Sequence, residues 1–189
     1  MRVSVIGTGY VGLVTGVCLC EKGHEVVCVD TDLRKVEAIA QAKAPFHEPG
    51  LDGLLARHVG CQLSATTDLR AAVLDSELTL LAIGTPFDGR HIDLTYVREA
   101  ARQVGTALKD KAGYHVVVVK STVVPGTTDG VVLPILAESS GRTPGADLGV
   151  GMNPEFLSEG SAVEDFMRPD RIVIGVDDDA AGRRGLQAM

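Results

Sequence analysis

The first thirty residues contain the pattern that most constrains the fold: an apolar run, a glycine-rich turn, a helix-forming stretch and a second apolar run. Residues 2–6 (RVSVI) and 25–29 (EVVCV) are rich in β-branched side chains, which strands favour. Residues 10–22 carry an apolar face and are followed by Gly23, a common residue after a helix. Strand, helix and strand within about 30 residues predict a β-α-β unit with parallel strands.

The same alternation continues along the chain. Further strands are expected over 62–65, 78–83, 115–119, 147–150 and 171–176, and helices over 32–41, 51–58, 68–74, 94–108 and 126–138. The run at 115–119 (HVVVV) is so apolar that both of its faces should be covered. The predicted fold class is therefore α/β, a Rossmann-type doubly wound and mostly parallel sheet with helices on both faces. We expect one domain over residues 1–189.

The glycine-rich turn, Gly7-Thr-Gly9-Tyr-Val-Gly12, matches the pattern GxGxxG and lies directly between the first strand and the first helix. In that setting the first glycine permits a tight turn, and the second lets the backbone approach a pyrophosphate. The third lets the helix pack closely on the sheet. Free N–H groups at the start of the helix would bind the phosphates of a dinucleotide.

An acidic residue, Asp30, ends the second strand 18 residues after Gly12. A carboxylate there accepts hydrogen bonds from the ribose hydroxyls and repels a 2′-phosphate, which favours NAD over NADP. Lys35 is close enough in sequence to relieve part of that repulsion. The alternative interpretation is that the glycines only make a turn and that Asp30 only caps the next helix.

Two further loops are expected at the carboxyl ends of strands, where open parallel sheets bind their ligands. Gly84-Thr85-Pro86 follows the fourth strand, and Ser121-Thr122 follows the fifth. Their hydroxyls could contact a nicotinamide ribose or a reacting alcohol. Thr122 and Thr127 would serve equally well as helix caps, and spacing alone leaves both interpretations open.

The segment 153–160 (NPEFLSEG) follows the sixth expected strand. Glu155 and Glu159 are four residues apart and would share one face of a helix. Either carboxylate could act as a general acid or base if burial raised its pKa. The alternative is a solvated helix start, where acidic residues are favoured by the helix dipole.

Composition excludes several classes of function. The net charge of −7 argues against a nucleic-acid-binding protein, since such proteins need clustered cations. No uninterrupted apolar run is long enough for a membrane span, and neither membrane nor metal binding is predicted. The four cysteines, Cys18, Cys20, Cys28 and Cys61, have no metal-ligand spacing. We expect reduced thiols in a cytoplasmic protein.

Taken together, the loops resemble those of the UDP-glucose/GDP-mannose dehydrogenase family. The matching segments are 7–12 (GTGYVG), 48–51 (EPGL), 84–86 (GTP), 120–126 (KSTVVPG), 153–157 (NPEFL), 159–162 (EGSA) and 168–171 (RPDR). They extend over nearly the whole chain, and the later ones are far more specific than the glycine turn. The resemblance therefore favours a functional role for the segment 153–160.

The resemblance implies an enzyme that oxidises the primary alcohol of a nucleotide sugar to a carboxylate with two NAD. It implies cofactor contacts from Gly7, Gly9, Tyr10, Val11, Gly12, Asp30, Lys35, Gly84, Thr85, Pro86, Ser121, Thr122 and Glu159. It implies substrate contacts from Glu155, Phe156, Leu157 and Ser158. Glu155 would be the acid/base residue in hydrolysis of a cysteine-bound thioester, and Thr122 would help to order the water.

The family's nucleophilic cysteine lies in a downstream Gly-Gly-x-Cys-x-Pro-Lys-Asp type motif, which this sequence lacks. The central helical and carboxyl-terminal UDP-binding domains of the family are also absent. The segment 177–181 (DDDAA) begins like a capped helix, yet no stop signal precedes Met189. We therefore expect the NAD-binding half of a longer enzyme that forms homo-oligomers.

Substrate choice is less constrained by these residues. The stretch 159–171 resembles the members that act on UDP-glucose, whereas 150–155 and the spacing after Pro125 also suit those that act on GDP-mannose. UDP-glucose is the expected substrate, with GDP-mannose or another nucleotide sugar as the alternative. A second alternative is that this chain by itself is a catalytically silent NAD-binding module.

Overall fold

One sheet of seven strands organises the chain in the computed structural model, which describes residues 1–176 and 179–188. The strands are β1 (Arg2–Ile6), β2 (Glu25–Val29), β3 (Leu63–Thr66), β4 (Leu78–Leu81), β5 (His115–Val119), β6 (Leu148–Met152) and β7 (Gly175–Val176). Their spatial order is β3-β2-β1-β4-β5-β6-β7. Strands β1 to β6 pair in parallel, and β7 pairs antiparallel to β6.

The strand order reverses between β1 and β4. From β1 the chain builds outward through β2 to β3, and then returns to the other side of β1 to add β4, β5 and β6. The crevice beyond the carboxyl ends of the strands at such a reversal is where doubly wound sheets bind ligands. The glycine turn leaves β1 at this point.

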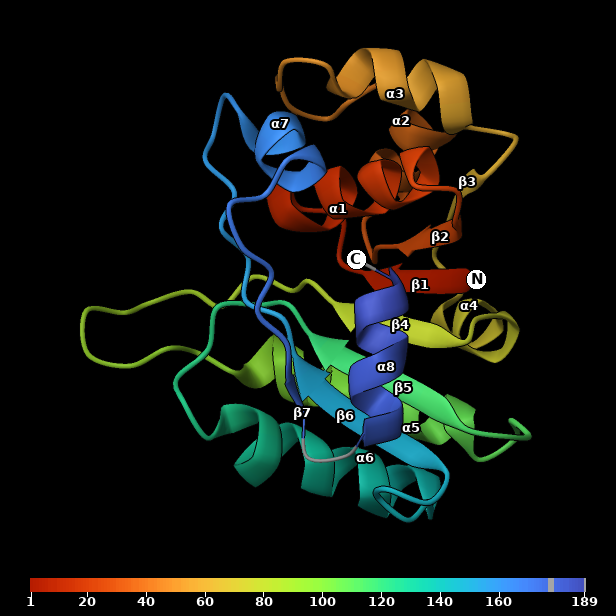
Figure 1. Ribbon diagram of the computed structural model, residues 1–189, viewed down its shortest axis with the longest axis vertical. Helices are drawn as coiled ribbons and strands as arrows, with labels where there is room; N and C mark the ends of the chain where they lie inside the picture. Colours follow the sequence, from red (N-terminus) through yellow and green to blue (C-terminus); the bar gives the residue numbers. More distant parts are fainter. Residues whose placement is uncertain (177–178, 189) are drawn as a thin grey trace.

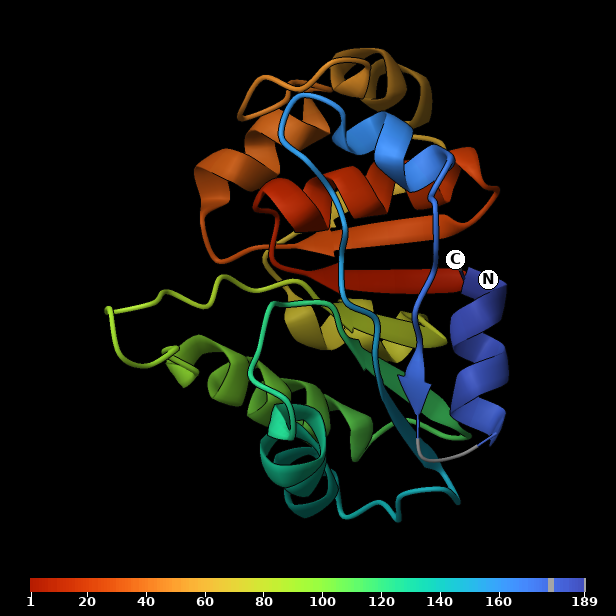
Figure 2. The ribbon, with the colours of Figure 1, turned by 60° about the vertical axis from the view of Figure 1, so that its left-hand side comes forward.

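Helices cover both faces of the sheet (Figures 1 and 2). They are α1 (Tyr10–Glu21), α2 (Leu33–Ala40), α3 (Leu51–His58), α4 (Leu69–Asp75), α5 (Thr95–Leu108), α6 (Leu133–Ser140), α7 (Ala162–Met167) and α8 (Asp179–Ala188). A π-helical turn, η1 (Thr128–Val132), precedes α6. One core cluster includes side chains of α1, α3 and α7, and the other includes those of α4, α5 and α6.

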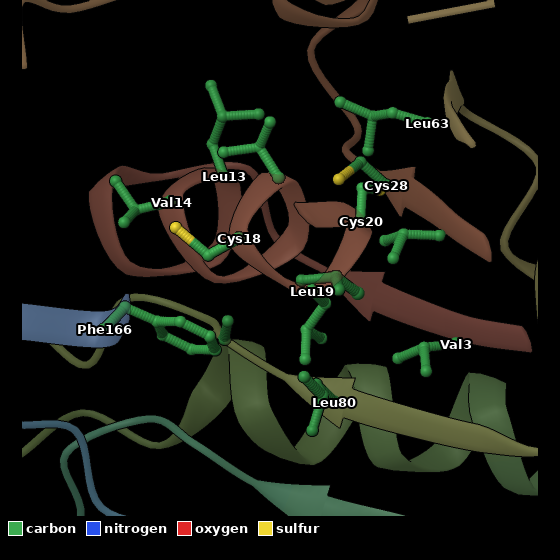
Figure 3. Packing of buried hydrophobic residues seen from close by; sticks show 14 of the residues in the cluster. Val3, Leu13, Val14, Cys18, Leu19, Cys20, Cys28, Leu63, Leu80 and Phe166 are labelled. Atoms are coloured by element: carbon green, nitrogen blue, oxygen red, sulfur yellow. The ribbon is translucent and has the colours of Figure 1, made fainter. Parts of the chain in front are cut away.

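Alternate residues of each central strand supply the two cores. Val116 and Val118 of β5 pack with the α1 side, whereas Val117 and Val119 pack with the α5 side. All of β5 is buried, as its unbroken apolar run predicted. Figure 3 shows the first core, in which α1 side chains lie above β1 and Phe166 of α7 closes one end. The predicted Rossmann-type fold is confirmed.

Two predicted elements were wrong in detail. The strand expected over 171–176 is reduced to Gly175–Val176, because the carbonyl of Val173 accepts a hydrogen bond from the Asn153 side chain at 2.8 Å. The helix expected over 126–138 begins as η1 and continues to Ser140. Pro134 lacks the N–H that a regular helix needs at that position, and a π-bulge is one response to this loss.

Helix α8 was expected to begin at residue 177, but Asp177 and Asp178 lie outside the described residues. The helix is described from Asp179 to Ala188. It lies beside β5 and β6.

Candidate functional site

The glycine turn has the geometry that a dinucleotide needs. Gly7 has φ +99°, and a Cβ there would lie 2.5 Å from the carbonyl oxygen of Ala82. A Cβ on Gly12 would lie 1.9 Å from the carbonyl oxygen of Gly7. A Cβ on Gly9 would meet nothing within 4 Å. Gly7 and Gly12 are thus required for packing, whereas Gly9 leaves the start of α1 accessible to a phosphate group.

Asp30 lies directly beside this turn. One of its carboxylate oxygens accepts hydrogen bonds from the amide and the hydroxyl of Thr8, at 2.9 and 2.6 Å. The same oxygen lies 3.4 Å from the ammonium of Lys35. The other oxygen accepts the amide of Asp32 at 3.0 Å. Asp32, not Asp30, caps α2, which argues against the capping interpretation of Asp30.

The hydrogen bonds control the ionisation of Asp30. Burial by itself would raise the pKa of this carboxyl, but the donors from Thr8 and Asp32, together with the charge of Lys35, outweigh it. The pKa therefore lies below its ordinary value. Asp30 is an anion at neutral pH, as the predicted discrimination against a 2′-phosphate requires.

Asp30 and the glycine turn line a cleft of about 430 Å³, within the usual range for small-molecule sites. Its walls come from the ends of β1, β2 and β4 and from one side of α5. The lining residues are Ile6, Gly7, Gly9, Val29, Asp30, Thr31, Lys35, Thr67, Leu69, Ala82, Ile83, Gly84, Tyr96, Glu99, Ala100 and Gln103. Among the predicted cofactor residues, the cleft brings together Gly7, Gly9, Asp30, Lys35 and Gly84.

The loops after β4 and β5 are bonded to each other. The hydroxyl of Thr85 donates to the carbonyl of Thr122 at 2.6 Å. The hydroxyl of Ser121 donates to the carbonyl of Leu81 at 3.1 Å and accepts the amide of Ile83 at 2.8 Å. Ser121 is buried and holds the loop in place, whereas the side chain of Thr122 is exposed. Pro86 is also exposed at this edge.

A second, smaller cavity of about 50 Å³ lies at the segment 153–160. Its lining residues are Lys120, Asn153, Pro154, Glu155, Phe156, Leu157, Asp165, Phe166, Pro169, Arg171 and Ile172. Glu155 is half-buried, and its carboxylate accepts the amide of Leu157 at 2.6 Å. Phe156 is exposed, and the guanidinium of Arg171 lies 4.6 Å from its ring centroid.

The residues 153–158 form an extended loop, and α7 begins only at Ala162. The prediction that Glu155 and Glu159 share a helix face was therefore wrong. Glu155 lines the cavity, whereas Glu159 is exposed and is not among its lining residues. The amides of Leu157 and Ser158 donate to the side chains of Glu155 and Asp165, at 2.6 and 2.8 Å, and such side-chain bonds compete with the backbone bonds of a helix.

Lys120 was not predicted as a site residue, although it directly follows β5 and lines this cavity. Its ammonium is buried and donates to the Asn153 side chain at 2.8 Å. Burial lowers the pKa of Lys120 to about 8, against a smaller opposing effect from the charge of Glu155. A charged residue directly after a wholly apolar strand was the available signal, since lysine is rarely buried without a partner.

Tyr10 is the first residue of α1, but it is not among the residues that line the cofactor cleft. The hydroxyl donates to Glu48 and lies 3.2 Å from the carbonyl of Ser158. Val11 is half-buried beside it. Tyr10 thus lies between the glycine turn and the segment 153–160, and its ring packs against Phe46 with centroids 5.2 Å apart.

The buried cysteines and the possible metal ligands in the described part of the chain form no further reactive site. Cys18, Cys20 and Cys28 are buried, and burial raises the pKa of each thiol to about 12. None of them is a ready nucleophile, because the thiolate is the reactive form. Across residues 1–176 and 179–188, no three His, Cys, Asp or Glu side chains gather as metal ligands would. Within these ranges no helix has the length and apolarity to cross a bilayer.

Residues 1–188 match the NAD binding domain of the UDP-glucose/GDP-mannose dehydrogenase family. The chain is 50% identical over 186 residues to GDP-mannose 6-dehydrogenase of Azotobacter vinelandii, covering 97% of this chain and 43% of the relative. It is 51% identical over 181 residues to UDP-glucose 6-dehydrogenase of Rhizobium meliloti, covering 94% and 40%. The chain spans less than half the length of these relatives.

Solved structures give the same result. GDP-mannose dehydrogenase from Pseudomonas aeruginosa superposes with a TM-score of 0.97 at 43% identity, covering 100% of this chain and 44% of that one. UDP-glucose dehydrogenase from Pyrobaculum islandicum superposes with a TM-score of 0.93 at 43% identity, covering 99% and 43%. The chain belongs to the UDP-glucose/GDP-mannose dehydrogenase family and corresponds to its NAD binding domain.

Proposed function

We propose that this chain is the NAD-binding half of UDP-glucose 6-dehydrogenase, which oxidises the C6 alcohol of UDP-glucose to UDP-glucuronate with two NAD. The observation that carries the proposal is the proximity of two site elements at the sheet edge. The Asp30 cleft opens beyond β1 and β4, and the cavity with Lys120 and Glu155 lies beyond β5 and β6. Ligands in the two would meet near the bonded Thr85 and Thr122 loops.

Each element has a separate task in this proposal. Bound NAD supplies the hydride acceptor. The start of α1 binds the pyrophosphate, and Asp30 with Lys35 binds the adenosine ribose. Lys35 and Asp30 are 3.4 Å apart, so the cation also moderates the charge that faces the ribose.

The segment 153–160, here called the substrate loop, would bind the sugar nucleotide through Glu155, Phe156, Leu157 and Ser158. Glu155 would accept or return a proton during hydrolysis of the acyl intermediate, and Thr122 would help to orient the water. Lys120 would hold Asn153 and, through it, the shape of the loop. Glu159 and the exposed Thr122 side chain would contact the cofactor from the loop edges.

The longer protein would supply what the chain lacks. The acyl-bearing cysteine, the central helical domain and the UDP-binding domain would follow residue 189, and the complete enzyme would form homo-oligomers. A cytoplasmic location fits the four unpaired cysteine thiols. On this proposal the isolated chain binds NAD and produces no NADH.

The main alternative is GDP-mannose as substrate, because the relatives that act on the two sugars are equally similar, at 50% and 51% identity. Full-length enzyme should be assayed for NADH formation with UDP-glucose and GDP-mannose in parallel. A higher kcat/KM for UDP-glucose supports the proposal, and a higher value for GDP-mannose replaces it with the alternative. Steady NADH formation by residues 1–189 alone would contradict the assignment of the nucleophile to the missing half.

A further inference from the structure

Glu48 is a buried carboxylate in an otherwise exposed loop. Only 3% of the residue is exposed, whereas its neighbours His47, Pro49 and Gly50 are exposed. A buried carboxylate is unfavourable unless donors satisfy its oxygens. The surroundings of Glu48 therefore have to be specific, and they are not explained by the NAD cleft or by the cavity at Glu155.

The donors to Glu48 come from two distant parts of the chain. The hydroxyl of Tyr10 donates to one oxygen, which also accepts the amide of Gly160 at 2.9 Å. The other oxygen accepts the amide of Ala162 at 2.8 Å. Burial by itself would raise the pKa of Glu48, but these hydrogen bonds outweigh it and hold the pKa below its ordinary value.

These contacts join the two halves of the site. Tyr10 is the first residue of α1 and lies within the glycine turn. Gly160 ends the substrate loop, and its amide also lies 3.2 Å from the Tyr10 hydroxyl. Ser161, which precedes α7, makes no side-chain capping bond. The carboxylate of Glu48 accepts the amide of Ala162 instead of a capping side chain. One carboxylate therefore holds both Gly160, at the end of the loop, and the first residue of α7.

We infer that Glu48 is a positioning residue that couples the NAD site to the substrate loop through Tyr10. When NAD restrains the first turn of α1, the Tyr10–Glu48 contact transmits that restraint to Gly160 and Ala162. Naming the segment a substrate loop rests on the proposed function, but the coupling itself does not. The coupling requires only that NAD binds at the glycine turn and that the hydrogen bonds of Glu48 to Tyr10, Gly160 and Ala162 connect this turn to the loop.

A purely structural Glu48 would give a different result. It would stabilise the loop equally with and without NAD, whereas a coupling residue changes how the loop responds to NAD. The response can be measured as amide hydrogen exchange of residues 158–163, with and without saturating NAD, in the chain of 189 residues. Saturation of each variant is checked first by calorimetry, so that weaker binding is not mistaken for lost coupling.

Three variants complete the experiment. Glu48→Gln keeps the shape of the side chain but places an amide group among N–H donors. Tyr10→Phe removes one hydroxyl and keeps the ring on Phe46. Glu164→Gln is the matched control, because it removes a carboxylate from α7 whose side chain is 73% exposed.

In the wild type and in Glu164→Gln, NAD should slow exchange at Gly160 and Ala162. In Glu48→Gln and Tyr10→Phe the slowing should shrink about ten-fold, the equivalent of one charge-assisted hydrogen bond. Unchanged slowing in both variants would show that NAD contacts the loop directly and would overturn the inference. So would the lack of any NAD effect in the wild type.

Should Glu48→Gln fail to fold, Tyr10→Phe carries the test alone. The measurement requires no sugar nucleotide and no turnover. A full-length enzyme that fails to oxidise UDP-glucose would refute the proposed function and leave this result standing.

Discussion

The carboxylate of Asp30 accepts both the amide and the hydroxyl of Thr8, the residue between the first two glycines of the turn, at 2.9 and 2.6 Å. The end of β2 is thereby bonded to the turn that follows β1. Under the proposed function Asp30 then has two tasks: it orders the turn that binds the phosphates, and it places a negative charge beside the ribose. Substitution should affect both.

Asp30→Asn should reduce discrimination between the two cofactors. NAD affinity should fall about ten-fold, because the ribose and Thr8 lose a charged acceptor. NADP affinity should fall less, because its 2′-phosphate no longer meets a carboxylate. Isothermal titration with both cofactors measures the ratio. Asp32→Asn is the control, since it removes the same charge two residues away and asparagine caps helices well.

Equal affinity of the wild-type chain for NAD and NADP would contradict the role given to Asp30. A change of the ratio in Asp32→Asn as large as that in Asp30→Asn would also do so, because it would trace the effect to general charge rather than to position.

Alanine at Gly9 and at Gly12 should separate binding from folding. Gly9 has φ −68° and ψ −171°, which alanine adopts easily, and its Cβ would meet no atom within 4 Å. Gly9→Ala should therefore fold with a loss of at most about 1 kcal/mol, the usual cost of alanine at a helix N-cap. It should bind NAD poorly, since the methyl group would occupy the space that the phosphates approach.

Gly12→Ala should do the opposite. Its Cβ would lie 1.9 Å from the carbonyl oxygen of Gly7, so the helix and the turn would have to move apart at a cost of roughly 1–3 kcal/mol. Urea unfolding measures the loss for both variants. Similar losses of stability in the two, or unimpaired NAD binding by Gly9→Ala, would refute the separate roles.

Glu155→Gln in the full-length enzyme should slow the hydrolytic step more than the first hydride transfer. The half-buried carboxylate lines the cavity at the substrate loop, and an amide cannot accept a proton from water. Stopped-flow NADH absorbance should show a retained early phase followed by slowed turnover, while Glu164→Gln shows neither change. Equal slowing of both phases would rule out the assigned role.

The sequence was sufficient to predict the Rossmann-type fold because its signals are local. Each apolar run predicts a strand over its own residues, and the glycine turn and Asp30 predict the ends of the strands that they directly follow. The expected strand over 171–176 failed because a distant side chain, Asn153, bonds the carbonyl of Val173. A run of β-branched residues carries no information about such a partner.

The difference between local and distant contacts also explains which parts of the site could be predicted. The proximity of Asp30 to the glycine turn could be predicted from spacing, because β1 and β2 are paired strands of one β-α-β unit and their ends line the same cleft. Glu48 could not, because its hydrogen bonds to Gly160 and Ala162 cross 112 and 114 residues. A glutamate between exposed neighbours has the local pattern of a solvated loop, and only the packing of α7 on α1 makes it a buried one.

The buried ammonium of Lys120 should give the stability of the chain a distinct pH dependence. Burial lowers its pKa from 10.5 to about 8 in the folded state, so the unfolded chain binds more protons between these values. Its contribution to the free energy of unfolding should therefore rise as pH increases from about 8 to about 10.5, by roughly 2–3 kcal/mol. The buried cysteine thiols act in the opposite direction over much of this range, since their pKa values are raised to about 12.

The useful quantity is thus the difference in stability between the wild type and Lys120→Met, measured by urea unfolding at several pH values. That difference should move in favour of the wild type with rising pH, whereas the corresponding difference for Lys109→Met, which replaces an exposed lysine, should stay level. A flat difference for Lys120→Met would mean that the ammonium is solvated, and it would contradict the burial of Lys120 in the wall of the cavity at the substrate loop.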